Sequence, residues 1–204
     1  MLATHRIYLA SSSPRRRELL GQIHVDFEVL AFRGAPRLDP DVSEAVLPGE
    51  AALAYAQRVA RAKADAGLKR LEWRQLPSRP VLAADTTVVI NGEILGKPDS
   101  AEHAVVMLRA LSGTVHQVIT AVAIALPDAM LEATSVSDVR FRDLDEAEIR
   151  RYVATREPLD KAGAYGIQGR AAAFVEEIRG SYSGIVGLPL FETACLLRQA
   201  GYPI

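Results

Sequence analysis

Patterns typical of strands and helices alternate along the whole of this 204-residue chain. Short apolar runs at residues 25–30 and 81–90 predict strands. Ala52, Ala56, Val59 and Lys63 recur at the spacing of one helix face and predict a helix over about 50–70. The other expected elements are a strand at 7–10 followed by a helix from 14, helices at 99–111, 145–154 and 189–199, and strands at 117–126, 136–144 and 174–178. This alternation favours an α/β fold, and the length favours one domain over residues 1–204.

The composition excludes several classes of protein. With 24 Lys and Arg against 25 Asp and Glu, the net charge of −1 argues against stable nucleic-acid binding, which needs a basic field. The one cysteine, Cys195, lies in an apolar run and can form no internal disulfide. Neither a signal segment nor an 18-residue apolar span is present, so we expect a cytoplasmic protein without membrane contact.

Three arginines, at positions 15–17, stand at the start of a predicted helix. Ser13 suits the N-cap and Pro14 the first helical position. A helix N-terminus carries a partial positive charge, so cations there are disfavoured unless an anion lies between them. The arrangement is typical of a phosphate-binding site, because the planar guanidinium of arginine can donate two parallel hydrogen bonds to one phosphate. A solvated basic turn is the alternative.

Asp85 is the one carboxylate in the apolar run 81–90. A buried carboxylate without a partner costs several kcal/mol, so its side chain must be paired, bound to a metal ion or poised as a base. Each of these states requires other polar groups beside this strand.

Asn91 and Gly92 form the strongest short hairpin signal in the chain. The two-residue turn places Thr86 opposite Lys97, which makes a structural Asp85–Lys97 ion pair the alternative to a functional site. Strict alternation sends Asp85 and Thr86 to opposite faces of the sheet. Both can line one site only at a strand end or a bulge, for which Gly96 is a candidate.

Lys63 falls on the apolar stripe of the helix at 50–70, where a snorkelling lysine at the edge of the core is one explanation. The loop before this helix carries Asp39, Asp41 and Glu44. These acids are either solvated or able to hold a divalent cation over a cleft.

Two glycine-rich runs and one histidine remain. The run 160–169 lets backbone approach a ligand closely, although it lacks the ending of a P-loop. The run 180–184 is expected to form a tight turn, with an anion site as the alternative. His116 has no nearby ligand-type residues and is expected to be a satisfied structural histidine.

Six spaced blocks together resemble the Maf family of nucleotide pyrophosphatases. They span nearly the full chain and follow one another in the same order as in the family. The matching blocks are Ala10 to Arg16, Ala83 to Thr86, Gly96 to Pro98, Leu111 to Gly113 with His116, Asp160 to Gly169, and Gly180 to Leu190. The resemblance implies an elongated, two-lobed mixed sheet flanked by helices with a deep central cleft, as in inosine triphosphate pyrophosphatase-like enzymes. The form of residues 161–169 looks like the branch that acts on dTTP and UTP.

The resemblance also implies roles for individual residues. Asp85 matches the proposed proton acceptor, and Glu44 matches the acidic loop residue, although residues 32–37 make this loop longer than is usual in the family. The other matches are Lys63 and Lys97 as phosphate-contacting lysines, and Arg15, Thr86 and Gln168 as specificity positions.

We expect hydrolysis of the phosphoanhydride between the α and β phosphates of a small nucleotide. Asp85 would deprotonate the attacking water and, with Glu44, hold a divalent cation, Mg²⁺ or Mn²⁺. Lys63 and Lys97 are expected to take part in catalysis by neutralising the phosphates. The residues expected to bind the substrate are Ser13, Arg15, Arg16, Thr86 and Gln168. The alternatives are a 7-methyl-GTP or broad-specificity pyrophosphatase and a non-enzymatic regulator of cell division. A homodimer is compatible with the sequence.

Overall fold

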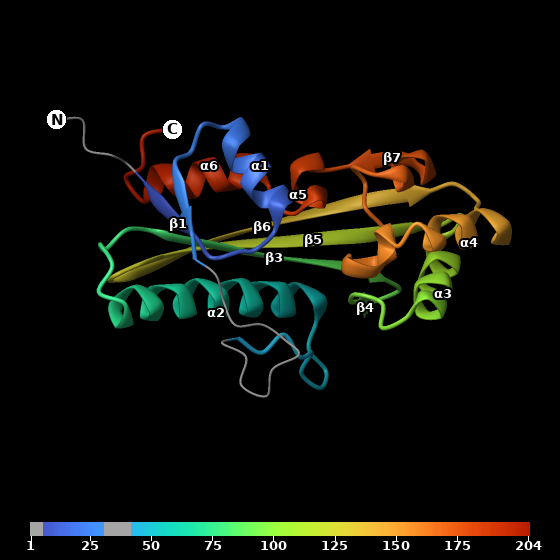
Figure 1. Cartoon of the computed structure of the whole chain (residues 1–204), viewed down its shortest axis with the longest axis horizontal. Coiled ribbons are helices and arrows are strands. Elements are labelled where there is room, and N and C mark those ends of the chain that lie inside the picture. Colours follow the sequence, from blue (N-terminus) through green and yellow to red (C-terminus); the bar gives the residue numbers. More distant parts are fainter. Residues whose placement is uncertain (1–5, 31–41) are drawn as a thin grey trace.

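The computed structural model describes residues 6–30 and 42–204. In this part of the chain a seven-stranded mixed sheet forms the centre of the molecule, which confirms the α/β class (Figure 1). The strand order is β2-β1-β3-β5-β6-β7, and β4 pairs with β3 off this path. The strands are β1 (Ile7–Leu9), β2 (Phe27–Val29), β3 (Val81–Ile90), β4 (Glu93–Leu95), β5 (Val115–Leu126), β6 (Ala129–Phe141) and β7 (Val175–Arg179).

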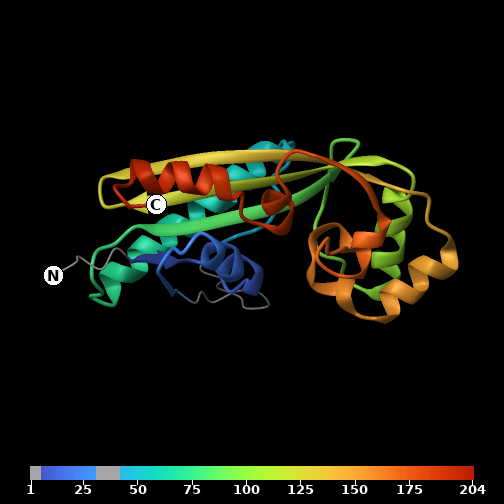
Figure 2. The ribbon, with the colours of Figure 1, turned by 90° about the horizontal axis from the view of Figure 1, so that it is seen from above.

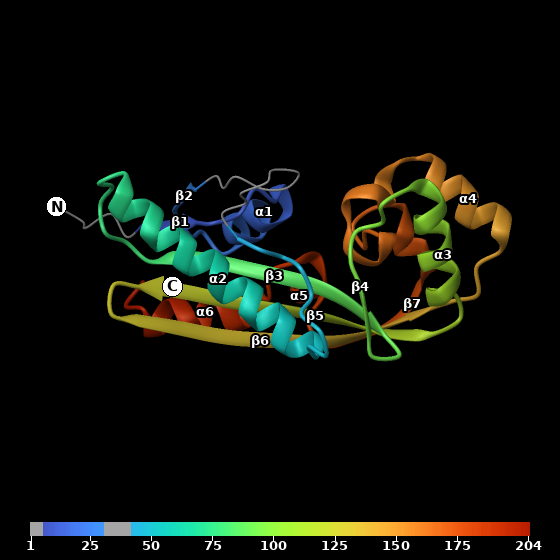
Figure 3. The same cartoon turned by 90° about the horizontal axis from the view of Figure 1, so that it is seen from below.

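The helices divide the molecule into two lobes along the length of the sheet (Figures 2 and 3). In the first lobe α2 covers one face of the sheet, while α1, α5 and α6 lie on the other; the second lobe holds α3, α4 and three short 3₁₀ turns. The helices are α1 (Pro14–Gln22), α2 (Ala52–Trp73), α3 (Ala101–Leu111), α4 (Glu146–Ala154), α5 (Tyr182–Val186) and α6 (Leu190–Gln199), with 3₁₀ turns at Glu157–Asp160, Ala162–Ala164 and Arg170–Phe174. No helix among the described residues is long and apolar enough to cross a membrane.

Alternation along β3 explains how its two faces are packed. Val81 and Ala83 join the core under α2, where Ala56 and Ala60 repeat at helical spacing and allow close approach of the helix to the sheet. The side chains between them, such as Leu82, pack on the opposite face. This alternation directs Asp85 toward α2 and Thr86 toward α1 and α5.

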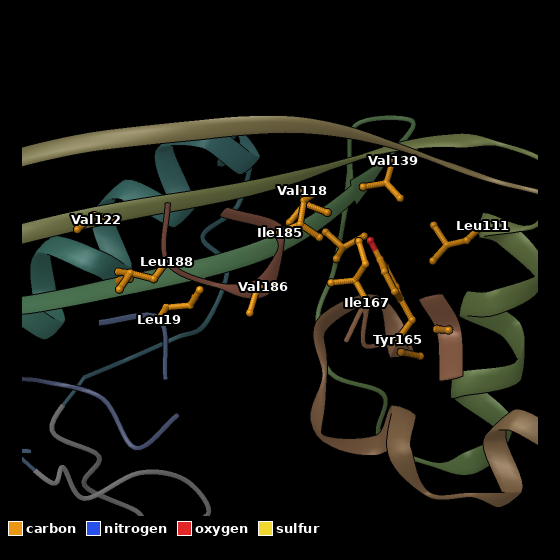
Figure 4. Packing of buried hydrophobic residues seen from close by; sticks show 14 of the residues in the cluster. Leu19, Leu111, Val118, Val122, Val139, Tyr165, Ile167, Ile185, Val186 and Leu188 are labelled. Atoms are coloured by element: carbon orange, nitrogen blue, oxygen red, sulfur yellow. The ribbon is translucent and has the colours of Figure 1, made fainter. Parts of the chain in front are cut away.

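One apolar core continues from the first lobe into the second. Val118 of β5 and Ile185 of α5 belong to the same buried cluster as Tyr165 and Ile167 of the second lobe. Figure 4 shows Ile185 and Val118 beside Ile167. Buried apolar contact of this kind fixes the relative position of the two lobes, so that groups from both can form one site.

The hairpin at Asn91 and Gly92 forms as predicted, with φ angles of 51° and 83° and with Ile90 paired with Glu93. The ladder between β3 and β4 ends at Leu95, so Lys97 lies beyond the paired residues.

Two expectations about the later elements are wrong. Strand β6 begins at Ala129 rather than at 136, and its full length forms a hairpin with β5. The run 180–184 is a helix start rather than a simple turn, because the Ser181 hydroxyl caps α5 by accepting a hydrogen bond from the Gly184 N–H at 3.0 Å.

Candidate active site

A cavity of about 1040 Å³ is lined by residues of both lobes. It brings together every side chain that the sequence singled out for the site and that the structure describes. These are Ser13, Arg15, Arg16, Glu44, Lys63, Asp85, Thr86, Lys97 and Gln168. Arg17, by contrast, is exposed and does not line the cavity, so two of the three arginines face it. Asp39 and Asp41 lie outside the described residues.

A gap at the edge of β3 explains how Asp85 and Thr86 reach the same cavity. Strand β1 pairs with β3 at Val81 and Leu82, and β4 pairs with it only from Val88 to Ile90. The stretch between has β5 as its one paired neighbour among the described strands, so the cavity reaches both faces of β3. Neither condition expected for this holds: Asp85 and Thr86 lie inside β3 rather than at its end, and no bulge forms at Gly96, because the β3–β4 register runs without a shift and ends at Leu95.

Lys63 joins two carboxylates at the wall of the cavity. Its Nζ lies 2.8 Å from Asp85 Oδ1 and 2.7 Å from Glu44 Oε1, and its side chain is 16% exposed. The interpretation of Lys63 as a snorkelling lysine is therefore wrong. The alternative Asp85–Lys97 pair does not form; within the described ranges, Lys63 is the ion-pair partner of Asp85, and Lys97 is exposed at the cavity.

The two carboxylates differ in basicity. Burial raises the pKa of Asp85 above its usual range, although Lys63 and Arg16 oppose the shift. Burial also acts to raise the pKa of Glu44, but Lys63, Lys97 and Arg16 together outweigh it and leave this pKa below its usual range. Asp85 is thus the stronger base of the pair, as a proton acceptor requires.

Arg16 is held in place by acceptors from three parts of the chain. Its Nε donates to the Gly187 carbonyl at 2.8 Å, and its terminal nitrogens donate to Ser11 Oγ at 3.1 Å and Thr86 Oγ1 at 3.3 Å. A guanidinium has five N–H donors, so two remain to bind a phosphate from a fixed position. Ser13 occupies the N-cap position as expected, but its hydroxyl does not cap the helix.

The second lobe presents Gln168 on a tightly held loop. The Glu157 carboxylate accepts a hydrogen bond from the Tyr152 hydroxyl at 3.0 Å and from the Arg170 N–H at 3.3 Å. Gly169 packs so closely against Glu157 that a Cβ at this position would collide with the carboxylate. This loop is exposed at the cavity, where it can meet the base of a nucleotide.

Sequence reasoning missed several polar side chains that line the cavity, among them Tyr55 and Glu157. The signal for Tyr55 was present, because Tyr55 and Lys63 are eight residues apart on α2 and therefore share one face. Glu157 had no comparable signal, since its contacts depend on how the second lobe folds.

His116 has a structural role, but in the described structure only one of its two ring nitrogens has a hydrogen-bond partner. Its Nε2 lies 2.8 Å from the Tyr165 hydroxyl, whereas its Nδ1 is buried without a partner in the described structure. Burial lowers the pKa of His116 to about 4, so the ring is neutral at physiological pH.

Asp85 and Glu44 provide carboxylate oxygens of the kind that bind a divalent cation such as Mg²⁺. Oxygens of Asp85 and Glu44 converge on one point, which Lys63 Nζ occupies. The described residues contain no group of three or more His, Cys, Asp or Glu side chains that could enclose a metal ion. Mg²⁺ is commonly held by one or two carboxylates together with substrate phosphates and water, and these two carboxylates can supply that part.

Comparisons with known proteins show to which family the chain belongs. The sequence pattern of the family described as "Maf-like protein" matches residues 6–200. A "dTTP/UTP pyrophosphatase" of Aromatoleum aromaticum is 61% identical over 98% of this chain and 97% of its own length. A "dTTP/UTP pyrophosphatase" of Nitrosospira multiformis is 57% identical over 98% of this chain and 97% of its own length.

Among solved structures, the Staphylococcus aureus Ham1 protein is similar over 68% of this chain and 72% of its own, with a TM-score of 0.46 and 22% identity. The family match covers nearly the whole chain, and the cavity described above falls within the matched residues. The chain therefore belongs to the Maf-like protein family.

Proposed function

We propose that this protein hydrolyses dTTP and UTP to the nucleoside monophosphate and pyrophosphate. The observation that carries the proposal is the cluster of Asp85, Lys63 and Glu44 in one cavity with Arg16 and the Gln168 loop. The names of relatives at 57–61% identity support the same activity and substrates. A net charge of −1 also favours a small nucleotide over a nucleic acid as the ligand.

The mechanism requires a proton acceptor beside the triphosphate and cations that neutralise the negative charge of the phosphates. Asp85 accepts a proton from the attacking water while the new phosphorus–oxygen bond forms and the α–β phosphoanhydride bond breaks. The cations of Arg15, Arg16 and Lys97 bind the phosphates and stabilise the charge that moves to the leaving pyrophosphate. A divalent cation held by Asp85 and Glu44 would add charge neutralisation at the same phosphates.

The direct test is product analysis on dTTP and UTP with Mg²⁺ or Mn²⁺. We expect the monophosphate and pyrophosphate in equal amounts, with slower turnover of CTP and 7-methyl-GTP. Release of orthophosphate with a nucleoside diphosphate, or a preference for 7-methyl-GTP, would contradict the proposal.

Gln168→Glu tests how the base is recognised. An amide can both donate and accept, which matches the two carbonyls and one N–H of a uracil or thymine edge, whereas an ionised carboxylate can only accept. We expect kcat/KM for dTTP and UTP to fall by about 10²-fold, and the ratio of CTP to UTP turnover to rise, because mismatched polar groups are left unpaired.

The control for this change is Gln199→Glu, the same substitution at an exposed position that ends α6 and does not line the cavity. It should leave the order of substrates unchanged. If Gln168→Glu gives the same order of substrates as Gln199→Glu, Gln168 does not recognise the base.

A further inference from the structure

The segment that carries Glu44 is tied to α2 at several points; we call residues 44–50 the Glu44 segment. The Tyr55 hydroxyl donates to the Glu44 carbonyl at 3.1 Å, and an Arg58 terminal nitrogen donates to the Ala45 carbonyl at 2.9 Å. Both hydrogen bonds hold the backbone that directly follows the Cα of Glu44. That side chain is 55% exposed, so its own packing contributes little to its position.

Glu50 stabilises the C-terminal end of the segment through hydrogen bonds of its carboxylate. Its carboxylate receives two hydrogen bonds from Arg58, at 2.5 and 2.8 Å, and a third from the Leu47 N–H at 3.0 Å. The Arg58 guanidinium also lies 5.5 Å from the centre of the Tyr55 ring. Arg58 thus contacts Ala45, Glu50 and Tyr55, each of which belongs to the Glu44 segment or binds it. Because the hydrogen bond from Arg58 lowers the pKa of Glu50 to about 2, the pair stays ionised at any physiological pH.

The Glu50 carboxylate is not used for capping α2. The N-cap of this helix is Ala51, which makes no side-chain cap, and the first turn holds no acidic residue. An acid placed at a helix start without a capping role points to another use for its oxygens. Here they organise the Glu44 segment and the arginine that binds it.

We propose that Arg58 is a positioning residue for the active site, acting through Ala45 and Glu50 to hold the Glu44 carboxylate against Lys63. The inference rests on the proposed pyrophosphatase function. It assigns Arg58 no contact with substrate, and Arg58 does not line the cavity. Its effect on turnover is therefore indirect, and the proposal assigns that effect to Glu44.

The chain supplies a matched control on the same helix. Arg61 lies one turn after Arg58 and makes a similar bidentate pair with Glu132 of β6, with Nε to Oε1 at 2.9 Å. This pair ties α2 to the sheet outside the cavity. Arg58→Ala and Arg61→Ala each remove one arginine–glutamate pair from α2, but only the first releases the Glu44 segment.

The experiment measures kcat for dTTP in Arg58→Ala, Arg61→Ala, Glu44→Gln and the double variant Arg58→Ala with Glu44→Gln. We expect Arg58→Ala to lower kcat about 10-fold, since small misplacements of catalytic groups are costly, and Arg61→Ala to change it less than about 2-fold. In the Glu44→Gln background, Arg58→Ala should add less than about 2-fold, because residues that act through one another are non-additive. Arg58→Lys should recover part of the loss.

A second readout is independent of activity. A protease specific for glutamate should cleave after Glu44 about 5-fold faster in Arg58→Ala than in the wild type or Arg61→Ala, because local opening controls cleavage. If Arg58→Ala fails to fold, Arg58→Lys and Glu50→Gln replace it in both measurements.

Three outcomes separate the possibilities. Equal kcat and cleavage rates in Arg58→Ala and Arg61→Ala overturn the positioning role, as does a 10-fold loss that is the same in the Glu44→Gln background. A wild-type protein that releases no pyrophosphate from dTTP refutes the proposed function instead, and the cleavage rates still decide whether Arg58 holds the segment.

Discussion

Asp85→Asn is expected to lower kcat for pyrophosphate release by about 10³-fold, within the range for loss of a positioned general base. Asparagine has nearly the same shape as aspartate and preserves the packing under α2, but its amide cannot accept the proton of the attacking water. The measurement is steady-state pyrophosphate release from dTTP at saturating divalent metal. Turnover within 10-fold of the wild type would exclude Asp85 as the proton acceptor.

The same substitution should not destabilise the protein. The folded state raises the pKa of Asp85, chiefly through burial, so the folded protein binds a proton more readily than the unfolded chain does. The stability from this group is present below the unfolded pKa and lost as pH rises through the folded pKa. At neutral pH we therefore expect Asp85→Asn to keep or raise the thermal midpoint, in contrast to its loss of activity.

The control for the catalytic loss is Asp138→Asn on β6, which removes a carboxylate that accepts from Gln117 at 3.2 Å and does not line the cavity. It should retain wild-type turnover. Equal losses in the two variants would point to a general effect of carboxylate removal rather than to proton transfer.

Arg16→Lys is expected to lower kcat/KM for dTTP by about 10²-fold or more. Lysine has one nitrogen and cannot reach the three acceptors that hold Arg16 while still donating to a phosphate. Loss of two hydrogen bonds to a charged group, at about 1.5–3 kcal/mol each, accounts for an effect of this size. The variant should keep its charge, its fold and measurable binding of triphosphate.

Arg17→Lys is the matched control, because Arg17 is adjacent in sequence but exposed outside the cavity. Initial-rate kinetics over a range of dTTP concentrations compare the two variants. If their kcat/KM values agree within about 3-fold, the Arg16 guanidinium does not bind phosphate. Loss of even one hydrogen bond to a charged group should lower kcat/KM by more than that factor.

Local signals in the sequence predicted most elements of the fold. Ser100 and Asp145 cap their helices by accepting from backbone N–H groups three residues later, at 3.0 and 2.7 Å. Strand β3 spans Val81–Ile90 and is followed by the predicted hairpin. Caps, turns and continuous apolar runs act over a few residues, so a linear reading detects them.

The start of β6 was missed because its support is distant in sequence. Residues 129–135 include the polar side chains Glu132 and Thr134, which alone do not predict a strand. Both side chains bind residues of α2. Arg61 donates to the Glu132 carboxylate, and Gln57 Nε2 donates to Thr134 Oγ1 at 3.2 Å. Cross-strand pairing with β5 supplies the rest.

The residue types proposed for the chemistry could be recognised from the sequence: arginines at a helix start, one carboxylate in an apolar strand, and a lysine on a buried stripe. Which side chains pair with one another depends on the fold. Asp85 binds Lys63 rather than Lys97, because α2 packs on its face of β3 while the β3–β4 ladder stops at Leu95. Partner choice depends on which faces meet across long sequence separations, and that is set by the packing of the whole core.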